Sequence, residues 1–288
     1  MPPPLTELQI ELAGVCNIAC AYCTWRQREV GKQLMDTELA VTLLEQAAQF
    51  DPVPLVTLHG VGEATLHPHF RALLTLGHGL GLPLRLSTNC LTLDTARIAW
   101  LRQLTNLNFI LALHQGVPIK TKKKAQDQAL DFLASGPRCR QVEVLLVCDD
   151  QGASQAGRLA GTFLPVLERV PHSRLHFKQP QTWPKSPPVR GHIPTGAWEQ
   201  HPQVLIDRVA TPRSLARGCS MPDYLLSVQA DGTTTLCCVG EEDWGLANAK
   251  RQTLADIWQS AAAHSCRDAW RASSDRLPCG HCKNRGDC

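Results

Sequence analysis

The chain has 288 residues and a formal net charge of +3, so it can form one large domain or one domain with a smaller appendage. Its Lys and Arg residues are scattered apart from one run at 120–124, which argues against a basic stripe for nucleic acid. No run approaches the roughly 18 apolar residues of a membrane helix, and the start Met1-Pro-Pro-Pro lacks the features of a signal peptide. We therefore expect a cytoplasmic protein that binds neither nucleic acid nor membrane.

Short apolar runs alternate with segments of helical periodicity over residues 1–180. The predicted strands cover residues 8–12, 55–59, 84–88, 107–113, 142–148 and 175–178. The predicted helices between them cover residues 37–50, 69–80, 93–104, 125–134 and 154–170, and Asp36 is a plausible N-cap of the first. Alternating strands and helices imply an α/β fold with a parallel sheet. Six strands are too few for a closed eight-stranded barrel, so we expect a partial (β/α)6 barrel.

The amino-acid composition changes after residue 180. Seven prolines between residues 180 and 212 should break regular elements, so residues 181–218 are predicted to form a linker or a wrapping loop. Asp231-Gly232 separates two strand-like runs, 224–229 and 233–237, which predicts a hairpin, and residues 254–263 predict a helix. Residues 219–288 are therefore expected to form a small, cysteine-rich domain of a β-hairpin and a helix. Residues 279–288 at its end are too polar and too rich in cysteine to fold on apolar burial alone, so we expect an inorganic group to hold them in place.

Thirteen cysteines are many for a cytosolic chain, where thiols stay reduced, and metal ligation explains them best. Cys16, Cys20 and Cys23 follow the first predicted strand with the spacing CxxxCxxC. A 4Fe-4S cubane takes one ligand for each iron. Three thiolates therefore leave one iron open to a small molecule that carries an amine and a carboxylate. The alternatives are three thiols by chance or half of a zinc site.

The run Gly14-Val-Cys16-Asn-Ile-Ala-Cys20-Ala-Tyr22-Cys23 resembles the radical S-adenosylmethionine (SAM) superfamily, including the aromatic residue before the third cysteine. The resemblance implies that the open iron chelates the methionine part of SAM. It also implies that one electron from the cluster cleaves SAM to a 5'-deoxyadenosyl radical. A reducing partner such as flavodoxin or ferredoxin would supply that electron.

Two further segments resemble family elements in register with this loop. Gly60-Val-Gly62-Glu63 follows the second predicted strand, as does the family's glycine-glycine-glutamate element that contacts the SAM amine. Ser87 and Asn89 end the third strand, where the family contacts the SAM ribose. The resemblance thus assigns Tyr22, Gly60, Gly62, Glu63, Ser87 and Asn89 to cofactor binding. Cys90 replaces the usual glycine after this last element.

The C-terminal region resembles the SPASM/twitch extension of the family, which carries auxiliary clusters. Cys219, Gly232 and Cys237 fit the start of its signature, and Cys279-x2-Cys282 completes it. The four cysteines Cys219, Cys237, Cys279 and Cys282 would then saturate a second 4Fe-4S cluster. A zinc ribbon is the alternative, because ligand spacing cannot distinguish the two. The remaining C-terminal cysteines are spare, or one of them substitutes as a ligand: Cys238, Cys266 and Cys288.

The spacing of these cysteines is similar to that of the twitch dehydrogenases, which oxidise a secondary alcohol to a ketone. The resemblance implies a radical SAM oxidoreductase acting on a small molecule. His114, just beyond the fourth predicted strand, is the candidate proton acceptor, and its alternative role is that of a surface histidine. The second candidate function is the maturation of a ribosomal peptide by crosslinking or epimerisation. A first strand near Leu8 leaves little room for the N-terminal peptide-binding domain of such enzymes. A zinc-stabilised binding module without catalysis is the third candidate, and it would be colourless.

Overall fold

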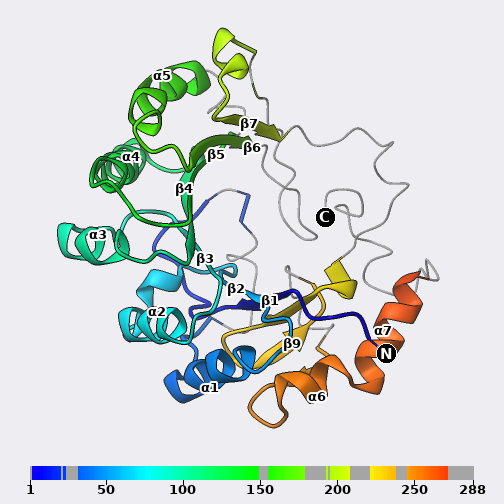
Figure 1. Cartoon of the computed structure of the whole chain (residues 1–288). Coiled ribbons are helices and arrows are strands. Elements are labelled where there is room, and N and C mark those ends of the chain that lie inside the picture. Colours follow the sequence, from blue (N-terminus) through cyan, green and yellow to red (C-terminus); the bar gives the residue numbers. More distant parts are fainter. Residues whose placement is uncertain are drawn as a thin grey trace.

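Seven parallel strands form the wall of an open barrel in the computed structural model of the chain, and helices cover its outer face (Figure 1). The structure describes residues 2–20, 22–23, 32–148, 155–178, 193, 195–207, 221–237 and 245–271, with Trp270 as backbone only. The strands are β1 (Glu7–Ile10), β2 (Leu55–Leu58), β3 (Leu84–Thr88), β4 (Leu107–His114), β5 (Gln141–Val147), β6 (Ser173–Lys178) and β7 (Val204–Asp207). Each pairs in parallel with its neighbour in chain order.

Helical crossovers join these strands, as the alternating sequence pattern predicts. The helices are α1 (Thr37–Ala47), α2 (Phe70–Gly79), α3 (Thr95–Leu101), α4 (Ile119–Ala134) and α5 (Ala156–Leu167). Asp36 caps α1 as predicted, because its carboxylate accepts hydrogen bonds from the backbone N–H groups of Glu38 and Leu39, both at 3.0 Å. Helix α4 begins before its predicted start and contains the lysine run. The predicted partial α/β barrel is therefore confirmed.

The two faces of the wall differ in chemistry. Along β1, Leu8 and Ile10 are fully buried and pack in the core between the wall and the helices. Gln9 points to the opposite face, because successive side chains of a strand alternate. We call this inner face of the barrel the lumen. Strands of parallel sheets are usually apolar on both faces, so a polar lumen suggests a function rather than a packing role.

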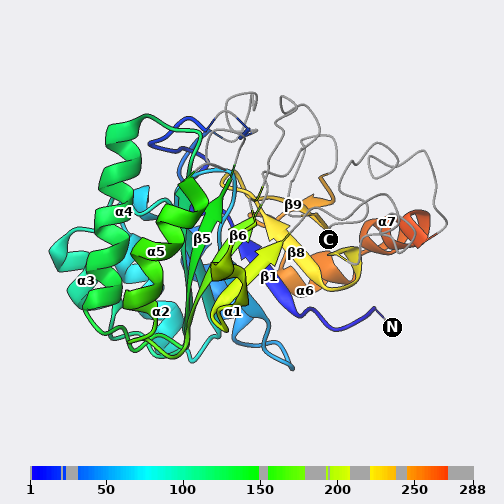
Figure 2. The same ribbon diagram turned by 90° about the horizontal axis from the view of Figure 1, so that it is seen from above.

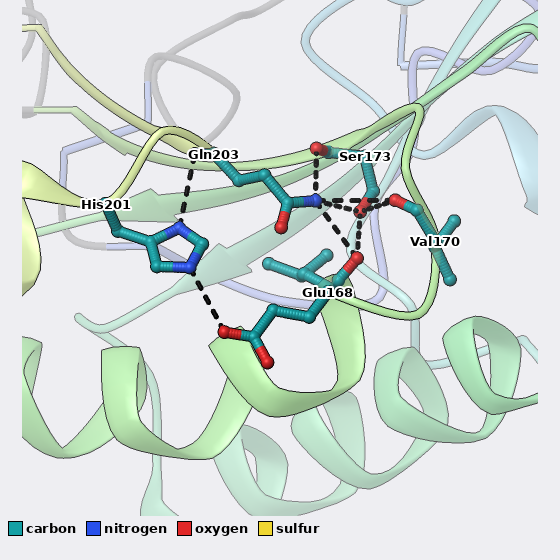
Figure 3. Close-up of polar contacts among 6 residues, drawn as sticks. Glu168, Val170, Ser173, His201 and Gln203 are labelled. Atoms are coloured by element: carbon teal, nitrogen blue, oxygen red, sulfur yellow. Dashed lines mark hydrogen bonds and ion pairs between the residues drawn. The ribbon is translucent and has the colours of Figure 1, made fainter.

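Strand β7 lies within residues 181–218, where the prolines predicted no regular element. That expectation is wrong for Val204–Asp207, which pairs with β6. Gln203, next to the strand, donates from Nε2 to the carbonyl oxygens of Leu167 at 3.0 Å and Ser173 at 3.0 Å (Figure 3). These contacts attach β7 to the end of α5 and the start of β6. The Leu167 carbonyl oxygen also accepts hydrogen bonds from the backbone N–H of Val170 and the hydroxyl of Ser173, so Gln203 adds to a local network beside the pairing of β7 with β6.

The C-terminal elements extend the same sheet on its other side. Strand β8 (Leu225–Val228) pairs in parallel with β1, and β9 (Thr233–Thr235) and β10 (Ala247–Asn248) follow in antiparallel order. Figure 2 shows this hairpin beside β1. The predicted turn at Asp231-Gly232 is confirmed, with Gly232 at φ +90°, a conformation that favours glycine. The sequence did not indicate that the hairpin would join the barrel sheet, and the domain boundary near residue 219 stays a prediction.

One long helix was predicted for residues 254–263, but two helices occupy this region. Helix α6 covers Leu254–Trp258 and has Gln259 as its C-cap, and α7 covers Ala261–Arg271. The Ser260 hydroxyl accepts a hydrogen bond from the Ala263 backbone N–H at 3.1 Å and so starts the new helix. Within the described residues, none of the helices has the length and apolar character needed to cross a membrane.

Candidate active site

The loop after β1 brings the three cysteines of the CxxxCxxC motif together. The backbone N–H of Cys23 donates to the carbonyl oxygen of Cys20 at 3.1 Å. Burial raises the pKa of Cys16, and the charges of Glu63 and Cys23 add to the effect. Burial also raises the pKa of Cys20 to about 12, with the thiols of Cys23 and Cys16 adding to it. The three cysteines therefore lie within electrostatic reach of one another.

The residues fit an iron-sulfur cubane. Among the described residues, no three His, Cys, Asp or Glu side chains gather around a point where a single metal ion could bind. A cubane does not require this, since each thiolate binds a different iron. Cys16, Cys20 and Cys23 would therefore hold three of the four irons. The chemistry of the donor set, one buried and two half-buried thiols on one loop, suits such a cluster.

The glycine loop after β2 packs directly against the cysteine loop. A Cβ atom at Gly62 would lie 1.9 Å from the carbonyl oxygen of Ala13, and one at Gly60 would lie 2.5 Å from Cγ of Glu11. The Glu63 backbone N–H donates to the carbonyl oxygen of Val15 at 2.8 Å. Only glycine permits this approach. The two glycines therefore place the loop's backbone beside the cysteines, as the family resemblance implies.

Glu63 connects this loop to the end of β3. Its carboxylate accepts hydrogen bonds from the hydroxyl groups of Thr65 at 2.6 Å and Thr88 at 2.8 Å, and from the Asn89 backbone N–H at 2.8 Å. The side chain is almost fully buried, and this burial raises the pKa of Glu63 against the effect of these donors. Glu63 therefore orders the cofactor loops through its side chain. Its predicted contact with SAM stays a prediction.

Asn89 contacts the cysteine loop from the opposite side. Its side-chain amide donates to Oδ1 of Asn17 at 2.6 Å and lies 3.8 Å from the sulfur of Cys16. The side chain of Ser87 makes no hydrogen bond to another described residue, and its predicted ribose contact stays a prediction. Cys90 has φ +70°, so the backbone keeps a conformation that favours glycine even though the family's glycine is replaced.

His114 ends β4 on the lumen side, next to the cysteine loop. Its Nδ1 lies 2.7 Å from the hydroxyl of Tyr22, and the two rings are 5.9 Å apart. Burial, together with the charge of His59, lowers the pKa of His114 to about 4. The imidazole is therefore neutral at pH 7. The structure brings together two residues that the sequence suggested separately, 92 positions apart.

Several lumen residues were missed by sequence reasoning as site residues. His59 follows β2, and although its side chain is exposed to the lumen, the surrounding wall and the charges of Arg85 and Lys178 lower its pKa to about 4. Residues on β2, β3 and β6 thus face the same space. The sequence does contain a pattern that could have revealed these lumen residues. Polar side chains recur at every second position of strands that otherwise resemble those of a buried parallel sheet.

Strands β5 and β6 contribute a buried ion-pair group to the lumen. Glu143 accepts a hydrogen bond from Arg174 Nε at 2.7 Å and is paired with His176 Nδ1 at 2.8 Å. Burial works to raise the pKa of Glu143, but the hydrogen bonds and charges of His176 and Arg174 lower it below its ordinary value. The carboxylate therefore stays charged and orients the imidazole of His176. Sequence reasoning assigned these residues no role.

The C-terminal cysteines lie largely outside the described residues. Cys237 follows β9, and its charge influences Cys266 on α7, whose pKa is raised chiefly by burial. The other three predicted ligands of the second cluster, Cys219, Cys279 and Cys282, lie outside the described residues, as do Cys238 and Cys288. The four-cysteine set stays a prediction.

Comparisons with known proteins agree with this picture. Residues 219–284 match the SPASM family model, an iron-sulfur cluster-binding domain. A curated relative from Pyrococcus furiosus, a tungsten-containing aldehyde ferredoxin oxidoreductase cofactor-modifying protein, is 30% identical over 82 residues. That match covers 28% of this chain and only 23% of the relative.

Three solved structures share the fold. SuiB from Streptococcus suis aligns with a TM-score of 0.69 at 14% identity, over 92% of this chain and 68% of SuiB. BtrN in complex with AdoMet and 2-DOIA aligns with a TM-score of 0.58 at 17% identity, over 99% of this chain and 95% of BtrN. Native anSMEcpe with bound AdoMet and the Cp18Cys peptide aligns with a TM-score of 0.63 at 14% identity, over 98% of this chain and 87% of anSMEcpe. The C-terminal match identifies residues 219–284 as an iron-sulfur cluster-binding SPASM domain, and the three solved structures share the fold of the chain.

Proposed function

We propose that the chain is a radical SAM enzyme that oxidises a polar small molecule by removing hydrogen from a carbon that bears a hydroxyl group. The observation that carries the proposal is the hydrogen bond between His114 and Tyr22, which places a neutral imidazole beside the cysteine loop. When bound, the first cluster and SAM would supply a 5'-deoxyadenosyl radical for hydrogen-atom abstraction, and a second cluster would supply an acceptor for the electron that the substrate gives up. The substrate hydroxyl must also lose a proton, and His114 is positioned to accept it.

The chain's own residues divide this work between them. Cys16, Cys20 and Cys23 would hold the first cluster, and the backbone of the loop with Gly60 and Gly62, which packs against the cysteine loop, would contact SAM. The remaining cofactor contacts that we propose come from side chains at the loop and strand ends: Tyr22, Glu63, Ser87 and Asn89.

The lumen suits a polar substrate. Arg85 and Lys178 lie within electrostatic reach of His59, and the side chains of both are partly exposed. Charged and neutral hydrogen-bonding groups therefore line one space, which favours a hydroxyl-bearing or amino-bearing ligand over an apolar one. Reduction by flavodoxin or ferredoxin is part of the proposal.

The second candidate function is peptide maturation. SuiB bound to its precursor peptide SuiA aligns with a TM-score of 0.67, over 91% of this chain. The fold therefore accommodates peptide substrates in other proteins. Deuterated substrates distinguish the two candidate functions, because deuterium transferred into 5'-deoxyadenosine identifies the molecule that loses hydrogen. Transfer from a polyol supports the first function, and transfer from a peptide supports the second.

The double variant Cys279→Ala with Cys282→Ala tests the role of the second cluster. It should keep about four of about eight irons per chain, from one of two cubanes, and still cleave SAM. Product formation should stop, because the electron acceptor is missing. The control is Cys139→Ala, which removes a buried thiol from the core between the barrel and its helices and should keep both clusters. A soluble double variant that forms product at the wild-type rate contradicts the proposal, and zinc in place of four irons contradicts the second cluster.

A further inference from the structure

Glu143 and His176 lie next to each other on the inner face of the barrel. The residues on either side of them in β5 and β6 are buried in the core under the helices: Val142, Val144, Leu175 and Phe177. Because successive side chains of a strand alternate, Glu143 and His176 belong to the lumen side. The strands pair Glu143 with Arg174 and Leu145 with His176, so the carboxylate and the imidazole come from adjacent rows of the inner face.

The hydrogen bond between the two side chains fixes the tautomer of the imidazole. Nδ1 of His176 is 2.8 Å from Oε1 of Glu143, and the side chains are only 13% and 9% exposed. Burial works to raise the pKa of Glu143, but its partners lower it below the ordinary value, so the carboxylate is ionised and can only accept. The proton in this hydrogen bond is therefore on Nδ1. Arg174 already balances the carboxylate charge, so the pair needs no second cation, and Nε2 of the neutral imidazole carries a lone pair.

Nε2 of His176 is buried and has no hydrogen-bond partner in the part of the chain that the structure describes. Native structures rarely leave a buried polar atom unpaired, because it has lost water without gaining a partner. The neighbours of His176 in register, Leu145 and Leu205, have apolar side chains that cannot supply a donor. Val204 and Ile206 pack against the core, so Leu205 belongs to the inner face, where it is 41% exposed. The inner face is therefore open beside the imidazole.

The cationic side chains of β6 have partners of their own. Arg174 donates from Nε to Glu143 at 2.7 Å, and Nζ of Lys178 is 3.8 Å from the Asp207 carboxylate. Nε2 is the imidazole nitrogen that lies farther from the backbone, so the missing donor belongs on the inner side of the wall rather than within the sheet. That is the position of a bound molecule.

We propose that His176, oriented by Glu143, is a specificity-determining residue whose Nε2 accepts a hydrogen bond from a hydroxyl or amino group of the substrate. The inference rests on the proposed function and deepens it. His114 is paired in register with Val147, so His176 lies two strands away and one row farther from the strand ends. In the proposed function His114 accepts the proton at the reacting carbon, and His176 binds a second donor group of the same molecule. The substrate class is thus a compound with at least two hydroxyl or amino groups, a polyol or an amino-polyol rather than a simple alcohol.

Nitrogen-15 NMR of the oxidised, cluster-loaded enzyme with labelled histidine tests the tautomer without any ligand. The signals of His176 are identified by their loss in His176→Gln. They should show a protonated Nδ1 and an unprotonated Nε2 at neutral pH. Glu143→Ala should remove this preference, because the carboxylate acceptor is gone. A proton on Nε2 in the wild type overturns the inference.

Calorimetry on the SAM-loaded enzyme measures the contact itself, with myo-inositol, sorbitol and glucosamine as probes. His176→Phe should weaken binding of the tightest-binding probe about tenfold, the effect of one lost hydrogen bond. A deoxy analogue that lacks the contacted hydroxyl should bind His176→Phe and the wild type equally. His176→Gln should recover part of the affinity, because its amide oxygen is an acceptor. The matched control is His201→Phe, which should bind like the wild type, since His201 makes a similar pair with Glu168, at 3.2 Å, beside α5 (Figure 3).

The possible outcomes separate this inference from the proposed function. Equal affinity of the wild type and His176→Phe for the tightest-binding probe overturns the inference and leaves the proposed function standing. A wild type that binds none of the probes and transfers no deuterium from them to 5'-deoxyadenosine overturns the proposed function itself. If His176→Phe does not fold, the wild-type Nε2 signal decides. It should move toward the shift of a hydrogen-bonded nitrogen when the probe saturates the enzyme, and an unmoved signal overturns the inference.

Discussion

Glu11 and Val61 connect the cofactor loops to the C-terminal hairpin. Oε1 of Glu11 accepts a hydrogen bond from the Val61 backbone N–H at 2.9 Å, between the two glycines of the loop after β2. Oε2 lies 3.3 Å from the backbone N–H of Ala230, at the turn between β8 and β9. The carboxylate is 4% exposed. A single buried side chain thus joins two backbone segments that are far apart in the sequence.

Glu11→Gln should lower the free energy of unfolding by about 1–3 kcal/mol, because an amide nitrogen would face one of two backbone donors and leave it unsatisfied. Hydrogen exchange should rise at Val61 and Ala230. Glu45→Gln, an exposed carboxylate on α1, is the control and should change stability by less than about 0.5 kcal/mol. Equal exchange at both amides in Glu11→Gln and wild type would show that the carboxylate does not join the segments.

Gly62→Ala should prevent stable binding of the first cluster and SAM. The added methyl group would overlap the Ala13 carbonyl oxygen, so the glycine loop must move away from the cysteine loop. Gly79→Ala at the end of α2 meets nothing within 4 Å and serves as the control, with up to about 1 kcal/mol gained from helix propensity. Iron content and SAM binding by calorimetry check the pair. Wild-type SAM affinity in Gly62→Ala would contradict the close approach.

Gln203→Ala should destabilise the protein by about 1–3 kcal/mol, since it removes the donor that the carbonyl oxygens of Leu167 and Ser173 share. The loss should concentrate at the edge of the sheet, with faster hydrogen exchange in β7 and at the start of β6. Gln200→Ala, an exposed residue in the preceding 3-10 turn, is the comparison. Urea unfolding of both variants measures the difference, and equal midpoints would exclude the anchoring role.

The lumen histidines should make stability depend on pH. The pKa values of His59, which is exposed to the lumen, and of the half-buried His114 are each lowered to about 4 from an ordinary value near 6.5, chiefly because the surrounding wall desolvates the charged imidazole. Below pH 6.5 the unfolded chain takes up protons that the folded chain excludes. Their contribution is therefore complete above pH 6.5 and is lost as the pH falls toward 4. The unfolding temperature of the wild type should fall over this range, and that of His59→Gln with His114→Gln should fall less. Parallel curves would show that these histidines do not carry the effect.

The sequence by itself determined the local features. Strand and helix positions follow from apolar periodicity, which is a property of neighbouring residues, so five helices and six parallel strands were predictable. Spacing also predicted Cys16, Cys20 and Cys23 as one ligand set, a prediction that needs no tertiary information because the three lie within a single loop. The same holds for the turn at Gly232, whose φ of +90° is a local requirement. Two local inferences failed: prolines did not prevent β7, and one predicted helix is divided at Ser260.

Only the tertiary structure decided which distant side chains meet. The pairing of β8 with β1 joins residues more than 200 positions apart, and no periodicity in the chain encodes a strand's neighbour. For the same reason, the sequence did not reveal which side chains share the lumen. Whether His59 approaches Lys178 depends on the curvature of the sheet, not on either residue. Tyr22 and His114 were each visible as candidates, yet their hydrogen bond exists because β4 ends beside the cysteine loop. Local patterns specify elements and ligands, whereas the closure of the barrel brings the groups from separate strands into one cavity.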